Sequence, residues 1–556
     1  MQLRKKKKRP SKPFAIMFRD SKMASAYYKL NKAQIQSLKS PGAPVLLVKK
    51  NPGTAARHIS DRVSGFNNYE GIMIAYTPLH HLLFKNIDVP LVMTSGNVSE
   101  EPIASENNEA INKLGGICDY FLTNNRDIFS KYDDSVIRII GNREASIRRA
   151  RGYAPYPIKI ECDAGKNPVL ATGAQEKNTF CLLYSKFAII SQHLGDMDNA
   201  ETVHFFKDTL ENYMKIFGLP GLRMVVHDCH PGYATTDFAK SFMPSAQKLA
   251  VQHHKAHIAS VIAENRLLND MKNDFIGFAW DGTGYGDDGK IWGSEVFTVN
   301  RKLEFKRISH LAEKVLPGGE ATIKNPYRMS LVYLYNFWKK VICSPADLKS
   351  ADLKIDFNRY VYNEFPHYKE IIPLLEMQLV TRQIETGFNS PLTTSMGRLF
   401  DAVSSLLNLI HVSTYEGEAA VRLEMAASGT TGKQYTLCLV ENNNELIIDD
   451  FHLFNQIVAD IKNNIAVSII SSKFHNSLAH LILHTCRIHR EKSGIDTVLL
   501  SGGVFQNHLL LTKTARILKK EGFKVYSNNK VPVNDGGISL GQAFIAAVAQ
   551  DCKNKI

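Results

Sequence analysis

Short apolar runs that end in glycine or polar residues recur along the sequence, and stretches of helical spacing lie between them. The apolar runs lie at residues 169–175, 224–228, 275–286 and 496–507. Apolar runs of this length bounded by glycine are typical of buried strands, and strands that alternate with helices form α/β sheets. Ligands of such sheets bind at the carboxyl ends of strands, where glycine lets the backbone approach them closely. The sequence therefore predicts an α/β fold with binding sites at these turns.

The composition is that of a globular protein. With 556 residues, of which 44% are hydrophobic, the chain can bury large cores and has the length of three or four domain-sized units. It has no uncharged apolar run of roughly 18 residues, and its start is basic and contains proline, so neither a membrane span nor a secretion signal is predicted. The eight cysteines are scattered without a CxxC pair, which argues against a zinc ribbon or a disulfide framework and fits a reducing cytoplasm.

The formal net charge of +14 allows several kinds of partner. Nucleic acid, the phosphates of a nucleotide, or solubility alone would each account for it. Residues 3–13 concentrate this charge and pass directly into the apolar run 14–17. Such a segment is either a solvated tail or a set of cations directed at a phosphate from the edge of a fold.

Two histidines form the most distinctive chemical pattern. Helical spacing of apolar residues from 256 to 267 places His253 and His257 one turn apart on the same helix face. Neutral imidazoles in this arrangement suit one zinc or iron ion, although two ligands do not complete a site. The alternative is an exposed pair or a pair satisfied within the core.

Two aspartates are candidates to complete that site. Asp281 follows the apolar run 275–280, so we expect its carboxylate and a glycine turn at the carboxyl end of a strand. Asp535 precedes a helix of small residues, where it would act as an N-cap, as a metal ligand, or as both. A turn-capping role is the alternative for Asp281.

The first third of the chain carries groups suited to an anion. The strand-like run 90–93 ends in Thr94, Ser95 and Asn97, whose hydroxyl and amide groups match a phosphate or carboxylate. An ordinary polar turn is the alternative. Arginines at residues 138, 148, 149 and 151 add cations that bind phosphates well.

Prolines and glycines at residues 153–168 indicate a domain boundary. We expect one domain over residues 1–160 and a second over residues 167–550. Within the second, residues 306–435 show mostly helical spacing, which indicates a helical insertion in the α/β part.

The ordered motifs resemble a known family. They are KxRPxKPF (7–14), YTPLHHLL (76–83), TSGN (94–97), RRARGY (148–153), HHxAH (253–257), DGTGYG (281–286), SMGRLFDA (395–402), SGGVFQN (501–507) and NDGGISLGQA (534–543). The first part resembles an α+β YrdC-like domain that forms carbamoyl-adenylate. The second resembles a two-lobed α/β transferase domain of the actin/hexokinase/Hsp70-like superfamily. Their order is similar to the carbamoyltransferases of nickel-iron hydrogenase maturation.

The resemblance implies a set of roles for individual residues. ATP and carbamate would be bound by Lys7, Arg9, Thr94, Ser95, Asn97, Ser135, Arg138 and Arg149, with magnesium accompanying ATP. Iron or zinc would be bound by His253, His257, Asp281 and Asp535, which are also the implied catalytic residues. The nucleotide in the second domain would be contacted by Gly282, Thr283, Gly284, Gly397, Asp401, Gly502, Gly503 and Asn507.

The implied reaction is ATP-dependent formation of carbamoyl-adenylate, with pyrophosphate and then AMP released. The acceptor would be the C-terminal cysteine thiol of HypE, and the transferred group would supply cyanide ligands of the hydrogenase iron. This assignment implies a cytoplasmic enzyme with no membrane partner, and nucleic acid is not its expected partner. The alternatives are an enzyme of tRNA threonylcarbamoyladenosine synthesis and a non-catalytic nucleotide-binding remnant.

The sequence also departs from the family pattern. It contains no acylphosphatase-like segment, no zinc-finger cysteine pairs, and no counterpart of the first strand and glycine-rich loop of the YrdC-like domain. We therefore expect a YrdC-like domain that lacks its N-terminal part. A separate acylphosphatase and zinc-finger polypeptide would then be a further partner.

Overall fold

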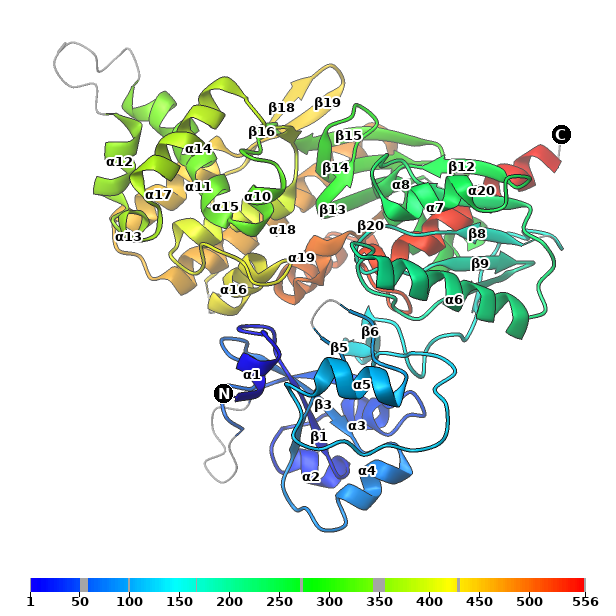
Figure 1. Ribbon diagram of the computed structural model, residues 1–556. Coiled ribbons are helices and arrows are strands. Elements are labelled where there is room, and N and C mark those ends of the chain that lie inside the picture. The colour runs from blue at the N-terminus through cyan, green and yellow to red at the C-terminus, as the bar shows by residue number, and fades with distance from the viewer. Residues whose placement is uncertain are drawn as a thin grey trace. The chain divides into compact units, whose positions relative to one another are not determined.

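The computed structural model describes residues 2–50, 59–98, 101–166, 168–270, 274–343, 356–427 and 431–554. Residue 167, where we place the start of the second domain, lies outside this set. The chain forms two compact units, and Figure 1 shows the elements of each. The first unit contains residues 1–272, 300–304 and 526–556, and the second contains residues 273–299 and 305–525. The first unit thus spans parts of both predicted domains.

The first sheet of the first unit has six strands in the order β4-β1-β3-β2-β5-β6. Their bounds are β1 (Ala15–Phe18), β2 (Val45–Lys49), β3 (Tyr69–Ile74), β4 (Leu91–Met93), β5 (Val136–Ile140) and β6 (Arg143–Arg148). Its helices are α1 (Gln2–Lys6), α2 (Ser21–Ser25), α3 (Lys32–Leu38), α4 (Pro78–Leu83) and α5 (Asn107–Leu114). Ile16, Phe18, Leu46, Ile72 and Ile137 form the centre of its core.

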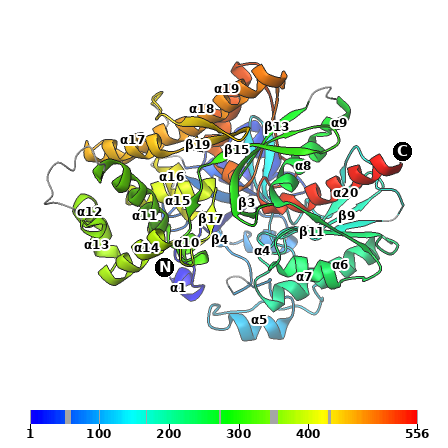
Figure 2. The same ribbon diagram turned by 90° about the horizontal axis from the view of Figure 1, so that it is seen from above.

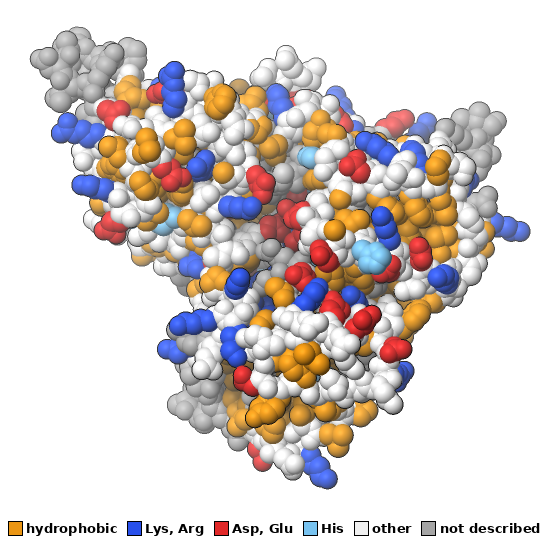
Figure 3. All heavy atoms as spheres, in the orientation of Figure 1, with side chains coloured by type: hydrophobic (Ala, Val, Ile, Leu, Met, Phe, Trp, Pro, Cys, Tyr) orange, Lys and Arg blue, Asp and Glu red, His pale blue; other side chains and the backbone are white. Residues whose placement is uncertain are grey.

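The basic start of the chain forms α1 rather than an extended tail. Lysine and arginine side chains gather on the surface around this helix (Figure 3), where Lys5, Lys6 and Lys8 are exposed. Lys7 differs from them because it is buried. Of the two interpretations of this segment, the structure favours cations held at the edge of a fold, at least for Lys7.

The second sheet of the first unit also has six strands, in the order β12-β11-β8-β9-β10-β7. They are β7 (Ile158–Lys159), β8 (Val169–Ala171), β9 (Cys181–Tyr184), β10 (Phe187–Ile190), β11 (Met224–Asp228) and β12 (Gln247–Val251). The helices are α6 (Ala200–Ile216), α7 (Ala234–Ser241), α8 (His253–Asn265), α9 (Leu267–Asp270) and α20 (Ile538–Asn554), and the 3-10 turn η3 spans Asp535–Gly537. The strands predicted from the apolar runs at residues 169–175 and 224–228 are confirmed in β8 and β11, and the helical spacing between these runs is confirmed in α6.

Helices cover both faces of this second sheet. Figure 2 shows α6 and α7 on one side and α8 with α20 on the other. Phe206 and Leu210 of α6 pack against Leu170, Leu182 and Val225 of the sheet. On the other side α20 contacts β8, β9, β10, β11 and α8. The C-terminal segment is therefore built into the same core as residues 168–265.

Gly541 sets the close approach of α20 to α8. A Cβ atom at this position would lie 1.9 Å from the backbone oxygen of Ala256, well inside van der Waals contact. Only glycine lets the two helix backbones approach so closely. This packing holds η3, and with it Asp535, near the start of α8.

The second unit contains a nine-stranded sheet with the main order β18-β19-β15-β14-β13-β20-β21. Its strands are β13 (Phe275–Tyr285), β14 (Ile291–Val299), β15 (Phe305–Leu311), β16 (Lys314–Val315), β17 (Leu392–Thr393), β18 (Cys438–Asn442), β19 (Glu445–Asp449), β20 (Thr497–Ser501) and β21 (Lys524–Ser527). β13 pairs in parallel with β20 and antiparallel with β14. The strands predicted from the apolar runs at residues 275–286 and 496–507 are confirmed in β13 and β20.

Most of the remaining second unit is helical, as predicted for residues 306–435. Its helices are α10 (Glu320–Lys324), α11 (Pro326–Phe337), α12 (Phe357–Glu364), α13 (His367–Ile371), α14 (Leu374–Thr386), α15 (Met396–Leu406), α16 (Glu418–Ala426), α17 (Phe451–Lys462), α18 (Val467–Ser493) and α19 (His508–Lys520). A π-helical turn, η1, spans Trp338–Ile342, and a 3-10 turn, η2, spans Gly503–Gln506. None of the helices in the described residues is long and apolar enough to cross a membrane.

The glycine turn expected after Asp281 is wrong. β13 continues through this segment to Tyr285, with a register shift between Trp280 and Gly284 that marks a bulge. The neighbouring strand β14 pairs on both sides of the bulge, so the backbone hydrogen bonds favour extension over a turn. Asp281 therefore lies at a bulge within a long strand.

We predict that Gly541→Ala lowers the stability of the first unit by about 1–3 kcal/mol, because the new methyl group overpacks the contact with α8. Differential scanning calorimetry would measure this as a lower unfolding midpoint. Gly221→Ala is the matched control, since a Cβ there meets nothing within 4 Å. Equal midpoints for the two variants would contradict the packing described here.

Candidate active site

His253 and His257 begin α8 and are both fully buried. Gln252 caps the helix, because its side-chain oxygen accepts a hydrogen bond from the Lys255 N–H at 3.0 Å. The two imidazole rings lie 5.0 Å apart between centroids, as the one-turn spacing predicts. The alternative of an exposed histidine pair is therefore wrong.

Asp535 lies beside both histidines. Its Oδ1 atom is 3.7 Å from Nε2 of His253 and 3.7 Å from Nε2 of His257. The expected N-cap role belongs to Asn534 instead, whose Oδ1 accepts from the Gly536 N–H at 3.0 Å. The reason is local: Asp535 is itself the first residue of η3, so the residue before it caps the turn.

The spacing of these three side chains fits a metal ion. One ligand atom from each of His253, His257 and Asp535 lies within 4.8 Å of the others. The 3.7 Å separations exceed a hydrogen bond. Two ligands of a tetrahedral zinc ion, each bonded at about 2.0–2.1 Å, are separated by about 3.4 Å. Two imidazoles and one carboxylate also match the ligand types that zinc and iron accept.

Asp228, the last residue of β11, is a residue for which no sequence pattern predicts a role. Its carboxylate accepts a hydrogen bond from Nδ1 of His253 at 2.8 Å, and both side chains are fully buried. The residues are 25 positions apart, and only the parallel pairing of β11 with β12 brings them together. No local spacing in the sequence signals such a contact.

Asp281 belongs to the second unit and is held by backbone donors there. Its Oδ1 accepts hydrogen bonds from the N–H groups of Gly282 at 2.8 Å and Gly503 at 3.1 Å. Its backbone oxygen accepts from Oγ of Ser395 at 3.1 Å. These contacts fix a buried carboxylate at the bulge of β13.

The predicted nucleotide-contacting glycines converge around Asp281. A Cβ atom on Gly397 would lie 2.8 Å from Cα of Gly282, and one on Gly503 would lie 2.7 Å from Oδ1 of Asp281. Gly502 has φ +98° and packs against the backbone of Trp280, where only glycine fits. Thr283 and Gly284 continue β13 beyond them. Backbone segments that lie more than 200 residues apart in the sequence are therefore in direct contact, because glycine has no side chain to separate them.

The remaining predicted residues of the second domain have partners within the fold. Asp401 lies on α15 and pairs with Arg398 at 3.0 Å, and burial raises its pKa to about 6. Asn507 caps α19 by accepting from the Leu510 N–H at 2.9 Å. Its amide nitrogen also contacts Nε2 of His475 at 2.9 Å.

In the first sheet, Lys7 is joined to the TSGN segment. Its Nζ donates to Oγ1 of Thr94 at 3.2 Å, to the Ser95 carbonyl at 2.7 Å and to Oδ1 of Asn97 at 3.3 Å. Burial, together with the charge of Arg9, lowers the pKa of Lys7 to about 8. The structure therefore brings four predicted residues together across about 90 positions of sequence.

The other predicted ligands of this domain make different contacts. Arg9 donates from Nε to the Lys12 carbonyl at 3.1 Å, and Ser135 hydrogen-bonds the backbone of Ala150 and Arg151. Arg138 stacks over Tyr69 at 4.9 Å. Arg149 is buried, with its guanidinium donating to three backbone carbonyls, those of Ile190, Tyr153 and Tyr156.

Three family models match the chain. Residues 1–150 match the Sua5/YciO/YrdC model, described as telomere recombination. Residues 164–264 match the HypF Kae1-like domain, and residues 277–542 match the second subdomain of the carbamoyltransferase Kae1-like domain. The fold and these matches define a carbamoyltransferase built from YrdC-like and Kae1-like parts.

Comparison with similar proteins identifies the family within this class. Carbamoyltransferase HypF of Synechocystis is 36% identical over 97% of this chain and 67% of the relative. Probable carbamoyltransferase HypF of Methanocaldococcus jannaschii is 32% identical over 98% of this chain and 67% of the relative. A full-length HypF crystal structure in a phosphate- and nucleotide-bound form has 39% identity and a TM-score of 0.88, covering 98% of this chain and 67% of that one. The chain belongs to the HypF carbamoyltransferase family and spans 67% of these relatives.

We predict that ATP binding to the first unit weakens about tenfold between pH 7 and pH 9. A lysine with a pKa near 8 is mostly charged at pH 7 and mostly neutral at pH 9, so Lys7 would lose its attraction for phosphate over this range. Isothermal titration calorimetry at both pH values would measure this change in the affinity for ATP.

Lys7→Met should bind ATP weakly at both pH values, and the exposed Lys5→Met should behave like the unmodified chain. An undiminished affinity of Lys7→Met would contradict a role for Lys7 in phosphate binding.

Proposed function

We propose that this carbamoyltransferase forms carbamoyl-adenylate from ATP and carbamate and transfers the carbamoyl group to a cysteine thiol at the C-terminus of a HypE-type protein. The observation that carries the proposal is the buried set of His253, His257 and Asp535 in a chain whose relatives are named HypF carbamoyltransferases. The hydrogen bonds that Lys7 donates to Thr94 and Ser95 support a separate site for the adenylation step. A reducing cytoplasm would keep the acceptor thiol reactive.

In this proposal His253, His257 and Asp535 bind iron or zinc, and Asp281 of the second unit supplies a fourth ligand. Such an ion would act as a Lewis acid that polarises the carbamoyl oxygen. The two backbone donors on Asp281 Oδ1 would orient its carboxylate. Burial of the histidines would exclude water, which otherwise competes with the thiol for the activated carbamoyl group.

The glycines would hold the nucleotide of the transfer step. Because Gly282, Gly397 and Gly503 carry no side chains, a nucleotide could approach the backbone of these segments closely. At the adenylation site, Lys7 would contact the phosphates of ATP together with the hydroxyl groups of Thr94 and Ser95 and the amide of Asn97. Magnesium would accompany ATP there.

The direct test combines the purified chain with ATP, a HypE-type acceptor, and either carbamoyl phosphate or bicarbonate with ammonia. We expect AMP release and a carbamoyl mass shift on the acceptor with bicarbonate and ammonia. An acceptor without its C-terminal cysteine should show no shift. Absence of both AMP and the mass shift from either carbamoyl source would contradict the proposal for this chain by itself.

We predict that Asp281→Ala loses most of the bound iron or zinc and all carbamoyl transfer, because a ligand and its oriented charge are removed. Metal content by mass spectrometry and acceptor modification would be measured together. Asp274→Ala, at an exposed position just before β13, is the matched control. Unchanged metal content in Asp281→Ala would rule out Asp281 as a ligand.

A further inference from the structure

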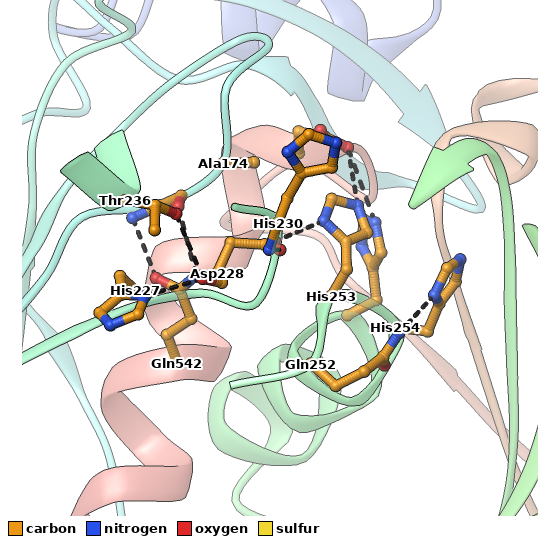
Figure 4. Close-up of polar contacts among 12 residues, drawn as sticks. Ala174, His227, Asp228, His230, Thr236, Gln252, His253, His254 and Gln542 are labelled. Carbon is orange, nitrogen blue, oxygen red and sulfur yellow. Dashed lines mark hydrogen bonds and ion pairs between the residues drawn. The ribbon is translucent and has the colours of Figure 1, made fainter. Parts of the chain in front are cut away.

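We infer that Asp228 is a positioning residue that orients His253 for metal binding. The inference rests on the proposed metal centre and assigns it a residue outside the ligand set. Asp228 Oδ2 accepts the hydrogen bond from Nδ1 of His253 at 2.8 Å, and neither side chain is exposed to solvent. Figure 4 shows the Asp228 side chain directed towards the His253 ring.

The carboxylate of Asp228 is itself held in place. Its Oδ1 accepts from the His230 N–H at 3.0 Å. Its backbone oxygen lies 2.7 Å from Nδ1 of His227 and accepts from Oγ1 of Thr236 at 3.2 Å. Figure 4 shows His227 and Thr236 on the side of Asp228 away from His253. A carboxylate that is held by a backbone N–H, on a main chain that is itself held by side chains, restricts the rotation of the imidazole that it binds.

The hydrogen bond also sets which nitrogen of His253 carries the proton. A carboxylate accepts hydrogen bonds, so Nδ1 of His253 carries the proton and Nε2 presents its lone pair. That lone pair faces Oδ1 of Asp535 across 3.7 Å. Two acceptors at this distance repel unless a cation lies between them. Asp228 therefore prepares Nε2 to bind a metal ion.

The charge of Asp228 supports the same conclusion. In the part of the chain that the structure describes, its only ion-pair partner is His253, with no lysine or arginine beside it. A fully buried carboxylate without a cationic partner is costly for a fold. A metal ion on the far nitrogen of the imidazole would offset this cost, because the ring would transmit part of its positive charge.

The sheet explains how the contact arises. β11 and β12 are parallel, with Asp228 paired to Val251 in the register. α8 begins two residues after Val251, so its first residue, His253, lies next to the end of β11. The contact therefore depends on strand register and not on a flexible loop.

The test measures affinity for Zn²⁺ by competition with a chelator, and the visible spectrum of the Co²⁺-substituted protein. Asp228→Ala should bind Zn²⁺ about 10–100-fold more weakly than the unmodified chain, with an altered Co²⁺ spectrum. Asp228→Asn keeps an oxygen that accepts from Nδ1, so its affinity should fall between the two. Asp237→Ala, an exposed aspartate on α7, should leave the affinity unchanged.

Equal Zn²⁺ affinities of the unmodified chain, Asp228→Ala and Asp228→Asn would overturn the positioning role while leaving the metal centre intact. If Asp228→Ala fails to fold, the Zn²⁺ affinity of Asp228→Asn tests the inference instead. An affinity equal to that of the unmodified chain would then overturn it. Absence of Zn²⁺ binding in the unmodified chain itself would overturn both the metal centre and this inference.

Discussion

The close packing of α20 on α8 is the constraint on which the candidate metal centre depends. Gly541 lets the helix backbones meet at Ala256, near the two histidines. At the other end of α8, Glu264 accepts hydrogen bonds from the backbone N–H groups of Asn529, Lys530 and Val531. Burial raises the pKa of Glu264, while these donors favour its charged form. Both ends of α8 therefore hold the C-terminal segment that carries Asp535.

The carboxylates around His253 make this arrangement suited to a cation. The line Asp228–His253–Asp535 places carboxylates on both nitrogens of one buried imidazole. Nearby, Oγ of Ser539 lies 2.8 Å from Oγ1 of Thr179, which ties the start of α20 to the sheet. A rigid, buried and electron-rich group of side chains is suited to a cation, and folding alone does not require such a group.

The sequence predicted the elements whose signals are local. Apolar runs located the strands of both Kae1-like halves, and helical spacing placed His253 and His257 on one face. The grouping of Lys7 with Asn97 came from resemblance to a family, because no periodicity links residues 90 positions apart. Roles that rest on the YrdC-like pattern alone, such as that of Arg149, remain predictions beside its observed backbone contacts.

The features that the sequence missed depend on tertiary contacts. Asp281 was expected at a turn, but pairing with β14 keeps its segment extended. No local pattern predicts the role of Asp228, because only the register of β11 with β12 places it beside His253. Asn534 takes the capping role expected for Asp535, since the 3-10 turn begins at Asp535, one residue earlier than that role requires. In each case the observed structure depends on a contact with a residue distant in sequence, or on a one-residue difference in where an element begins.

The most direct measurement of the central claim is a crystal structure of the chain grown with Zn²⁺, with anomalous data collected at the zinc edge. The account predicts one strong peak at about 2.0–2.1 Å from Nε2 of both His253 and His257, with an oxygen of Asp535 bound to the same ion. A peak away from these histidines, or histidine rings turned so that Nε2 no longer faces Asp535, would contradict it.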